Sequence, residues 1–294
     1  MQYLDSFYKY LEYERRNSTH TIIAYKTDIR QFCVFLEEKD ISLWKDVSSR
    51  TVRAWMVDMV NSGVSGRSVT RKISTLKVLF RYLMQQGVVE NNPAEHTVTP
   101  RLPKRLPVFV KEKEMDFLLD EVDFGDGFEG ARDRLIVEMF YSTGMRLSEL
   151  VALTDVQIDM GNGVLKVRGK RNKERIVPIL SELKASLVGY LNKRDVLFPN
   201  RANSCVFLTS KGLPVYHKLV YRVVNRYLKQ VSTVTKKSPH VIRHSFATAL
   251  LNRGADLNAI KELMGHANLA ATEVYTHNTY EQLNSIYKQA HPRA

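Results

Sequence analysis

Apolar residues recur at helical spacing through the first third of the chain, and this spacing predicts three helices. The first begins at Ser18 or Thr19, either of which can cap it, the second covers Ser49–Asn61, and the third covers Ser65–Gln86. In the third helix one apolar stripe consists of Val69, Ile73, Leu76, Phe80 and Leu83. Helices with one apolar face each can bury a common core, so this part is predicted to be a helical domain.

A proline-rich and basic stretch follows the third helix and ends the helical pattern. It holds Arg101, Lys104 and Arg105 and four of the nine prolines, namely Pro93, Pro100, Pro103 and Pro107. Proline cannot continue a helix and stiffens an extended chain, so residues 93–107 are predicted to be a linker. The linker separates a first domain, residues 1–92, from a second domain, residues 108–294.

The second domain combines helices with two short strands. Helices are predicted over Lys111–Leu119, Ala131–Ser142, Ser181–Leu191 and Pro214–Val231. The strand-like runs Val164–Arg168 and Arg175–Ile179 are joined by Gly169–Glu174, which is typical of a hairpin with a basic tip. Another helix starts at Ser238-Pro239, because serine caps helices and proline suits the first helical position. The predicted fold class is mainly α with a small β-sheet or hairpin.

The charge of the chain narrows the choice of partner. Lys and Arg number 44 against 31 Asp and Glu, which gives a net charge of +13 spread over both domains. This excess favours a polyanionic partner, most simply nucleic acid. Cys33 and Cys205 each stand alone and indicate neither a disulfide nor a zinc framework. No signal peptide or bilayer-spanning apolar run is visible, so we expect a cytoplasmic protein without membrane attachment.

Basic residues gather on one face of the third predicted helix, away from its apolar stripe. No acidic residue of the helix interrupts this face. Such a face is either solvated or in contact with phosphate, and the sequence leaves both open. The candidate DNA-binding residues are Arg67, Arg71, Lys77 and Arg81 on this face, with Arg171 and Lys173 at the hairpin tip.

Two places in the second domain hold residues that could bind an anion or a metal. Arg146 follows Gly144 at the head of a helical run, where it either forms a surface salt bridge with Glu149 or binds an anion. His240, Arg243 and His244 share one side of the later helix. The two histidines have the spacing of a metal pair, but no carboxylate accompanies them and the arginine would repel a cation. Phosphate is therefore favoured over metal.

The sequence also argues against several common activities. It contains no Gly-x-Ser-x-Gly, no Walker-type glycine loop and no complete dinucleotide-binding glycine motif. These absences count against hydrolase, ATPase and dehydrogenase functions. Tyr275, taken alone, is one of 14 tyrosines and could simply pack in the core.

The motifs taken together resemble a known family over essentially the whole chain. They are Thr143-Gly144-Met145-Arg146-Leu147-Ser148-Glu149-Leu150, Gly169-Lys170-x-Asn172-Lys173-Glu174-Arg175, His240-x-x-Arg243-His244, Gly265-His266 and Tyr275. This set resembles the tyrosine recombinases, or phage-integrase-like proteins, and among them the bacterial Xer type. The resemblance implies a two-domain DNA clamp, in which residues 1–92 are a helical SAM-like core DNA-binding domain and residues 108–294 are the catalytic domain.

The resemblance also implies an active site and a reaction. Tyr275 would be the nucleophile, surrounded by the other catalytic residues, namely Arg146, Lys170, His240, Arg243 and His266. The arginines and His266 would hold the phosphate, His240 would help to deprotonate the tyrosine, and Lys170 would protonate the departing 5′ oxygen. A covalent 3′-phosphotyrosine needs no metal, ATP or other cofactor. Arg171, Met264 and Ala267 depart from the usual Xer pattern without touching the catalytic set.

The partners implied by the family are a specific double-stranded DNA site and other recombinase subunits. We expect a homotetramer or a heterotetramer with a second recombinase on synapsed DNA, with an accessory activator as a possible addition. The segment after Tyr275, which includes Leu283, Ile286 and Tyr287, is a protomer-docking tail in this family. The sequence alone is equally compatible with packing of this tail on its own domain.

The expected role is Xer-like resolution of chromosome dimers at cell division. The alternatives are an integrase or invertase of a mobile element and a type IB topoisomerase, which resembles this active site. A non-cleaving DNA-binding or architectural protein is a further alternative from a different class. The complete catalytic set disfavours it, because binding alone does not need Tyr275.

Overall fold

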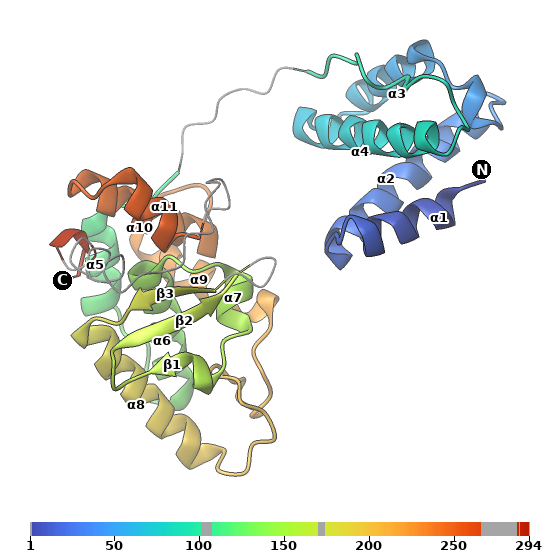
Figure 1. Ribbon diagram of the computed structural model, residues 1–294. Coiled ribbons are helices and arrows are strands. Elements are labelled where there is room, and N and C mark those ends of the chain that lie inside the picture. Colours follow the sequence, from blue (N-terminus) through green and yellow to red (C-terminus); the bar gives the residue numbers. More distant parts are fainter. Residues whose placement is uncertain (1, 101–107, 170–173, 266–286, 288, 294) are drawn as a thin grey trace. The chain divides into compact units, whose positions relative to one another are not determined.

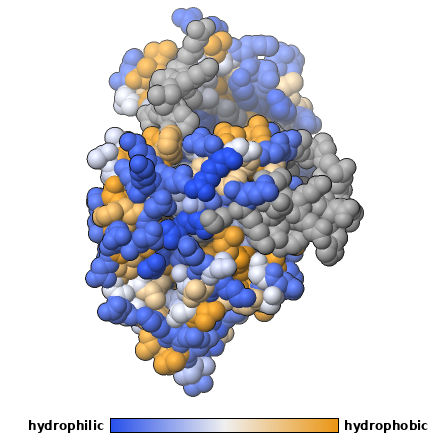
Figure 2. Space-filling view, turned by 90° about the vertical axis from the view of Figure 1, so that its left-hand side faces the viewer, coloured by the Kyte–Doolittle hydropathy of each residue, from blue (hydrophilic) through white to orange (hydrophobic). Residues whose placement is uncertain are grey.

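The computed structural model describes residues 2–100, 108–169, 174–265, 287 and 289–293, which fall into two compact units (Figure 1). The first unit is Met1–Arg105 and the second is Leu106–Ala294. Each has its own hydrophobic core. In the space-filling view, hydrophilic side chains cover much of the visible surface and apolar ones form separate patches (Figure 2).

The first unit is helical, as its apolar periodicity predicts. Its elements are α1 (Leu4–Lys9), the π-helical turn η1 (Tyr10–Glu14), α2 (Thr19–Glu37), the 3-10 turn η2 (Trp44–Asp46), α3 (Ser49–Asn61) and α4 (Gly66–Gln85). The hydroxyls of Ser18, Ser48 and Ser65 each accept a hydrogen bond from a backbone N–H in the first turn of α2, α3 and α4. The predicted stripe of α4 is fully buried, which confirms the assignment of its inward face.

The second unit is built around one central helix, α6 (Phe128–Thr143). Of its 16 residues 13 are buried, and it packs against α8, α9 and α10. The other helical elements are α5 (Glu112–Asp120), α7 (Leu147–Val151), the 3-10 turn η3 (Asp155–Gln157), α8 (Ser181–Leu197), α9 (His217–Val231), α10 (Pro239–Asn252) and α11 (Leu257–Leu263). The predicted fold class, mainly helical with a small sheet, is confirmed.

A small antiparallel sheet lies beside these helices, with strand order β1-β2-β3 (Figure 1). β1 is Ile158–Asp159, β2 is Val164–Arg168 and β3 is Glu174–Pro178. The predicted strand pair is present, and its register places Val167 opposite Arg175. The tip of the predicted hairpin, residues 170–173, lies outside the described residues.

Some boundaries differ from the predicted ones. α8 is six residues longer than expected, and α9 begins at His217 instead of Pro214. β1 was not predicted, because two residues show no periodicity. Ser238 stands at the N-cap of α10, but its hydroxyl makes no capping hydrogen bond and, within the part of the chain that the structure describes, is buried without a hydrogen-bond partner.

The described end of the C-terminal tail packs on its own unit. Tyr287 is fully buried, and its hydroxyl donates to the backbone oxygen of Ser142 in α6. His291 is also fully buried, with Nε2 3.0 Å from the same oxygen. Arg293 forms ion pairs with Asp120 and Glu182. Leu283 and Ile286 lie outside the described residues.

Candidate active site

The position of Arg146 depends on the turn that Gly144 makes at the end of α6. Gly144 ends α6 in the left-handed region at φ 58°, and a Cβ there would lie 2.5 Å from a ring carbon of Phe246. A side chain at this position would therefore be both strained and crowded. The turn delivers Arg146 to the N-cap position of α7, from which its guanidinium reaches back toward the unit's interior.

Glu149 is a buried carboxylate that holds two arginines. It accepts hydrogen bonds from the backbone N–H of Arg146 at 2.7 Å and from its Nη1 at 2.8 Å. Arg175 of β3 donates to both carboxylate oxygens, at 3.0 and 2.8 Å. Burial by itself would raise the pKa of Glu149, but the hydrogen bonds and charges of the arginines outweigh it and lower the pKa to about 2. Glu149 is therefore ionised at any working pH.

Arg243 of α10 is a buried charge without a carboxylate partner among the described residues. It is only 6% exposed, and it donates to the backbone oxygens of Gly144 and, at 2.6 Å, Met264. Within the described part of the chain no carboxylate lies within 4.0 Å of its guanidinium. Burial, then the positive charges of Arg146 and Arg175, lower its pKa to about 10. The group stays charged at neutral pH, so the structure holds a buried cation that needs an anion.

Three successive backbone oxygens at the end of α11 bring the arginines together. Leu263 accepts from Arg175 Nε at 2.7 Å, Met264 from Arg243 Nη2 at 2.6 Å, and Gly265 from Arg146 Nη2 at 2.7 Å. The last carbonyls of a helix lack intrahelical partners and carry partial negative charge. The cluster therefore contains three guanidinium groups and the single carboxylate of Glu149, a surplus of two positive charges.

His240 lies in the first turn of α10, close enough to the arginines to be affected by their charge. Burial, then the charges of Arg243, Lys236 and Arg146, lower its pKa below the ordinary value of 6.5. A lowered histidine pKa favours the neutral imidazole at pH 7, which can accept a proton. The side chain is more exposed than that of Arg243, so a substrate could reach it.

The structure brings together only part of the predicted catalytic set. Arg146 and Arg243 meet at the end of α11, with His240 nearby. The remaining predicted catalytic residues and the hairpin-tip DNA-binding residues lie outside the described part of the chain, namely Lys170, His266, Tyr275, Arg171 and Lys173. Their roles stay predictions.

Two site residues were missed or misjudged in the sequence. The sequence left a surface salt bridge between Arg146 and Glu149 open as an alternative; the two residues do pair, but the carboxylate is 3% exposed, so the pair does not lie at the surface. Arg175 was not singled out, although a signal existed. Along β3 buried and exposed residues alternate, and Arg175 falls on the buried face with Val177. A charged residue on the inward face of a strand requires a buried partner.

The basic face of α4 is less free than its sequence indicates, because carboxylates reach it from other segments. Arg71 pairs with Asp28 of α2, which is fully buried and also accepts from Lys72 at 2.9 Å. Lys77 donates to the backbone oxygen of Glu95. Arg81 lies 3.5 Å from the carboxylate of the same residue. Arg67, Arg71 and Arg81 nevertheless remain exposed.

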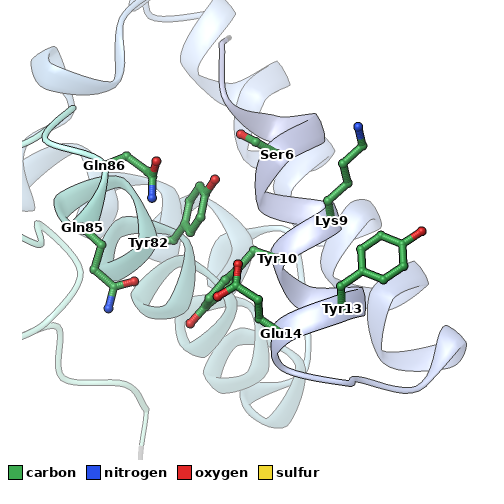
Figure 3. Close-up of a pocket in the computed structure, with 8 residues that line it drawn as sticks. All are labelled: Ser6, Lys9, Tyr10, Tyr13, Glu14, Tyr82, Gln85 and Gln86. Atoms are coloured by element: carbon green, nitrogen blue, oxygen red, sulfur yellow. The ribbon is translucent and has the colours of Figure 1, made fainter.

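A hollow of about 370 Å³ lies between η1 and α4 of the first unit, lined by Tyr10, Tyr13 and Tyr82 among others (Figure 3), and no predicted catalytic residue lines it. Among the described residues, no cluster of three or more His, Cys, Asp or Glu side chains could hold a metal ion. None of the helices described is long and apolar enough to cross a bilayer.

Comparison with known proteins finds similarity along the whole chain. Residues 109–282 match the Phage integrase family, and residues 4–87 match the phage integrase N-terminal SAM-like domain. The chain is 37% identical to Tyrosine recombinase XerC of Chlorobaculum tepidum, with 100% of this chain and 95% of that protein covered. It is 39% identical to Tyrosine recombinase XerC of Staphylococcus saprophyticus, with 100% and 99% covered.

Solved structures of recombinases are also similar to this chain. The XerA recombinase is 26% identical, with a TM-score of 0.50 and 100% of both chains covered. The XerH site-specific recombinase, bound to its palindromic difH substrate in a post-cleavage complex, is 24% identical. Its TM-score is 0.71, with 96% of this chain and 83% of that chain covered, and this likeness concerns the fold.

Proposed function

The chain belongs to the phage integrase family and is a Xer-like site-specific tyrosine recombinase, and from this premise we propose that Tyr275 cleaves DNA to resolve chromosome dimers. Enzymes of this family cut and rejoin DNA through a phosphotyrosine intermediate. XerC-named relatives favour this role over a mobile-element integrase or invertase and over a type IB topoisomerase.

The observation that carries this proposal is the buried guanidinium of Arg243, which has no carboxylate partner among the described residues. A scissile phosphate would supply the missing negative charge. Arg146 and Arg243 would bind its non-bridging oxygens, each with N–H groups left over from the backbone contacts. The charge that develops at phosphorus during attack would then meet donors already in place.

The chemistry then needs a deprotonated phenol. A free tyrosine has a pKa near ~10, so only about one in a thousand is ionised at neutral pH. Neutral His240 would accept the proton of Tyr275 as the phenolic oxygen attacks phosphorus. The bond from phosphorus to the 5′ oxygen breaks, and Lys170 protonates that oxygen. His266 would assist the arginines on the phosphate. Rejoining is the reverse exchange, so no metal, ATP or other cofactor is needed.

The domain roles and partners belong to the same proposal. Residues 1–92 would bind the core of the DNA site, and residues 108–294 would catalyse strand cleavage and rejoining. Residues 93–107 would link these two domains. The candidate contacts to DNA are Arg67, Arg71, Lys77, Arg81, Arg171 and Lys173. A homotetramer or heterotetramer with a second recombinase would synapse two sites in the cytoplasm, with an accessory activator as a further component.

A nicked suicide duplex carrying a recombination site tests the proposal. We expect the wild type to form a covalent protein–DNA complex that survives denaturing electrophoresis, and Tyr275→Phe to form none. Arg243→Ala should lose cleavage while it still binds DNA. Arg201→Ala is the matched control, because that guanidinium is already paired with Asp155 and Asp195. Covalent complex formed by Tyr275→Phe would refute the assigned nucleophile.

A further inference from the structure

Arg175 differs from the other two arginines of the cluster in how its donors are used. Its Nε donates to Leu263 at 2.7 Å, and its two terminal nitrogens donate to the two oxygens of Glu149 at 3.0 and 2.8 Å. The residue is 5% exposed. Each nitrogen is therefore committed to a protein acceptor. Among the described residues, Arg146 and Arg243 instead make these contacts only through their terminal nitrogens, and Nε has no acceptor there.

The position of Arg175 connects three parts of the catalytic unit. It lies on β3, paired with β2 opposite Val167. Through Glu149 it reaches α7, whose N-cap is Arg146, and through Leu263 it reaches the end of α11 (Figure 1). A Cβ on Gly265 would lie 3.1 Å from Arg175 Nη1 and 3.5 Å from Arg146 Nη1, so the two guanidiniums flank the same turn.

We propose that Arg175 is a positioning residue for DNA cleavage. It holds Glu149 so that the carboxylate orients Arg146, and it anchors the carbonyl of Leu263 so that residues 263–265 stay in place. The proposal rests on the proposed function. Because β3 carries this arginine, the strand pair that flanks the hairpin tip is tied to the same turn.

The chemistry of the contact requires arginine. A planar guanidinium can donate to both oxygens of one carboxylate and, through Nε, to a third acceptor at the same time. A lysine at this position keeps the charge but offers a single ammonium to acceptors on two elements. Glu149 would then lose one of its two bidentate contacts, and Arg146 and the α11 turn could move. Misplacement of a catalytic group by about 1 Å can cost roughly 10²-fold in rate.

The test compares Arg175→Lys with Arg168→Lys, a matched control on the same hairpin. Arg168 pairs with Glu174 at 3.0 Å on the exposed face, so its replacement should leave cleavage unchanged. For Arg175→Lys we expect single-turnover covalent complex formation on saturating suicide DNA to fall about 100-fold. The DNA dissociation constant should stay within about threefold of the wild type, because Arg175 is 5% exposed and each of its three nitrogens already donates to a protein acceptor. A structural defect alone would reduce the active fraction and not the single-turnover rate of the molecules that react.

The experiment has three outcomes that bear on the positioning role of Arg175. If a folded Arg175→Lys protein cleaves at the wild-type rate, or loses affinity as much as rate, the positioning role is overturned while the proposed function stands. If the wild type forms no covalent complex, the proposed function falls and takes this role with it. Should Arg175→Lys melt below the assay temperature, Arg175→Gln serves as the second variant, since an amide can still donate to one of the two acceptors. Its rate must also fall about 100-fold at unchanged affinity.

Discussion

His291 ties the C-terminal tail to α6 only while its imidazole is neutral. Its Nδ1 accepts the backbone N–H of Arg293 at 3.0 Å, so Nε2 carries the proton and donates to Ser142. Burial is the main reason why its pKa is lowered to about 4, and the nearby charges of Arg253 and Arg293 act in the same direction. A proton added at Nδ1 would face the N–H of Arg293 and add a buried charge beside two arginines.

The sign and size of the effect follow from the two pKa values. In the unfolded chain the imidazole has its ordinary pKa of 6.5, and in the fold it has about 4. Protons therefore bind the unfolded state preferentially between these values, and stability falls as the pH drops from 6.5 toward 4. At pH 5 this single group should cost about 2 kcal/mol of unfolding free energy relative to pH 7.5.

Urea unfolding at pH 7.5 and 5.0 measures this loss of unfolding free energy. His291→Gln is the comparison, because glutamine can still donate to the backbone oxygen of Ser142 but does not titrate. Trp44 and Trp55 are the only two tryptophans and lie in the first unit, so their fluorescence reports that unit separately from far-UV circular dichroism. We expect the second unit of the wild type to lose about 2 kcal/mol more than the variant. Equal losses in the two proteins would refute the reasoning.

Three further outcomes are expected. Since the pKa of His240 is lowered, the acid limb of the cleavage rate should lie below pH 6.5, and His240→Gln should remove that limb and slow cleavage about 100-fold. Gly144→Ala should destabilise the second unit by about 2–5 kcal/mol in thermal unfolding, because alanine is strained in the left-handed region and its Cβ would crowd Phe246 of α10. Gly254→Ala is the control: its φ is 81° but the space around it is open, so the unfolding free energy should fall by only about 1–2 kcal/mol. Replacing Arg67 and Arg81 by glutamine should reduce the salt slope of DNA binding by about 1.8 if both contact phosphate, and an unchanged slope would assign that face to solvent.

Local sequence patterns were sufficient for most of the fold. Helices α2, α3 and α4 follow from apolar spacing and serine caps, both of which act within four residues. The strand pair β2–β3 follows from two short β-branched runs. The end of α8 and the two-residue strand β1 were missed because tertiary packing decides them, and neither has a periodic pattern of its own.

The sequence indicated three residues that the structure places close together, but not the contacts that hold them there. Arg146, His240 and Arg243 were found through motifs, whereas the buried pairing of Glu149 with Arg175 was not. Those two residues are 26 positions apart, and the carbonyl that Arg146 contacts is 119 positions away. No periodicity in the sequence reports contacts across such separations. A buried face for Arg175 could have been read from strand alternation, but its partner could not.

The long separations within the arginine cluster have a consequence for synthesis of the protein. Arg146 emerges from the ribosome with α7, yet the backbone oxygen that holds it belongs to Gly265. Arg243 likewise donates to the backbone oxygen of Met264, which is synthesised 21 residues later. A nascent or truncated chain that ends before this turn therefore exposes guanidiniums that can attract DNA but has no oriented pair of them. The arginine cluster can therefore be completed only after residues 263–265 have been synthesised.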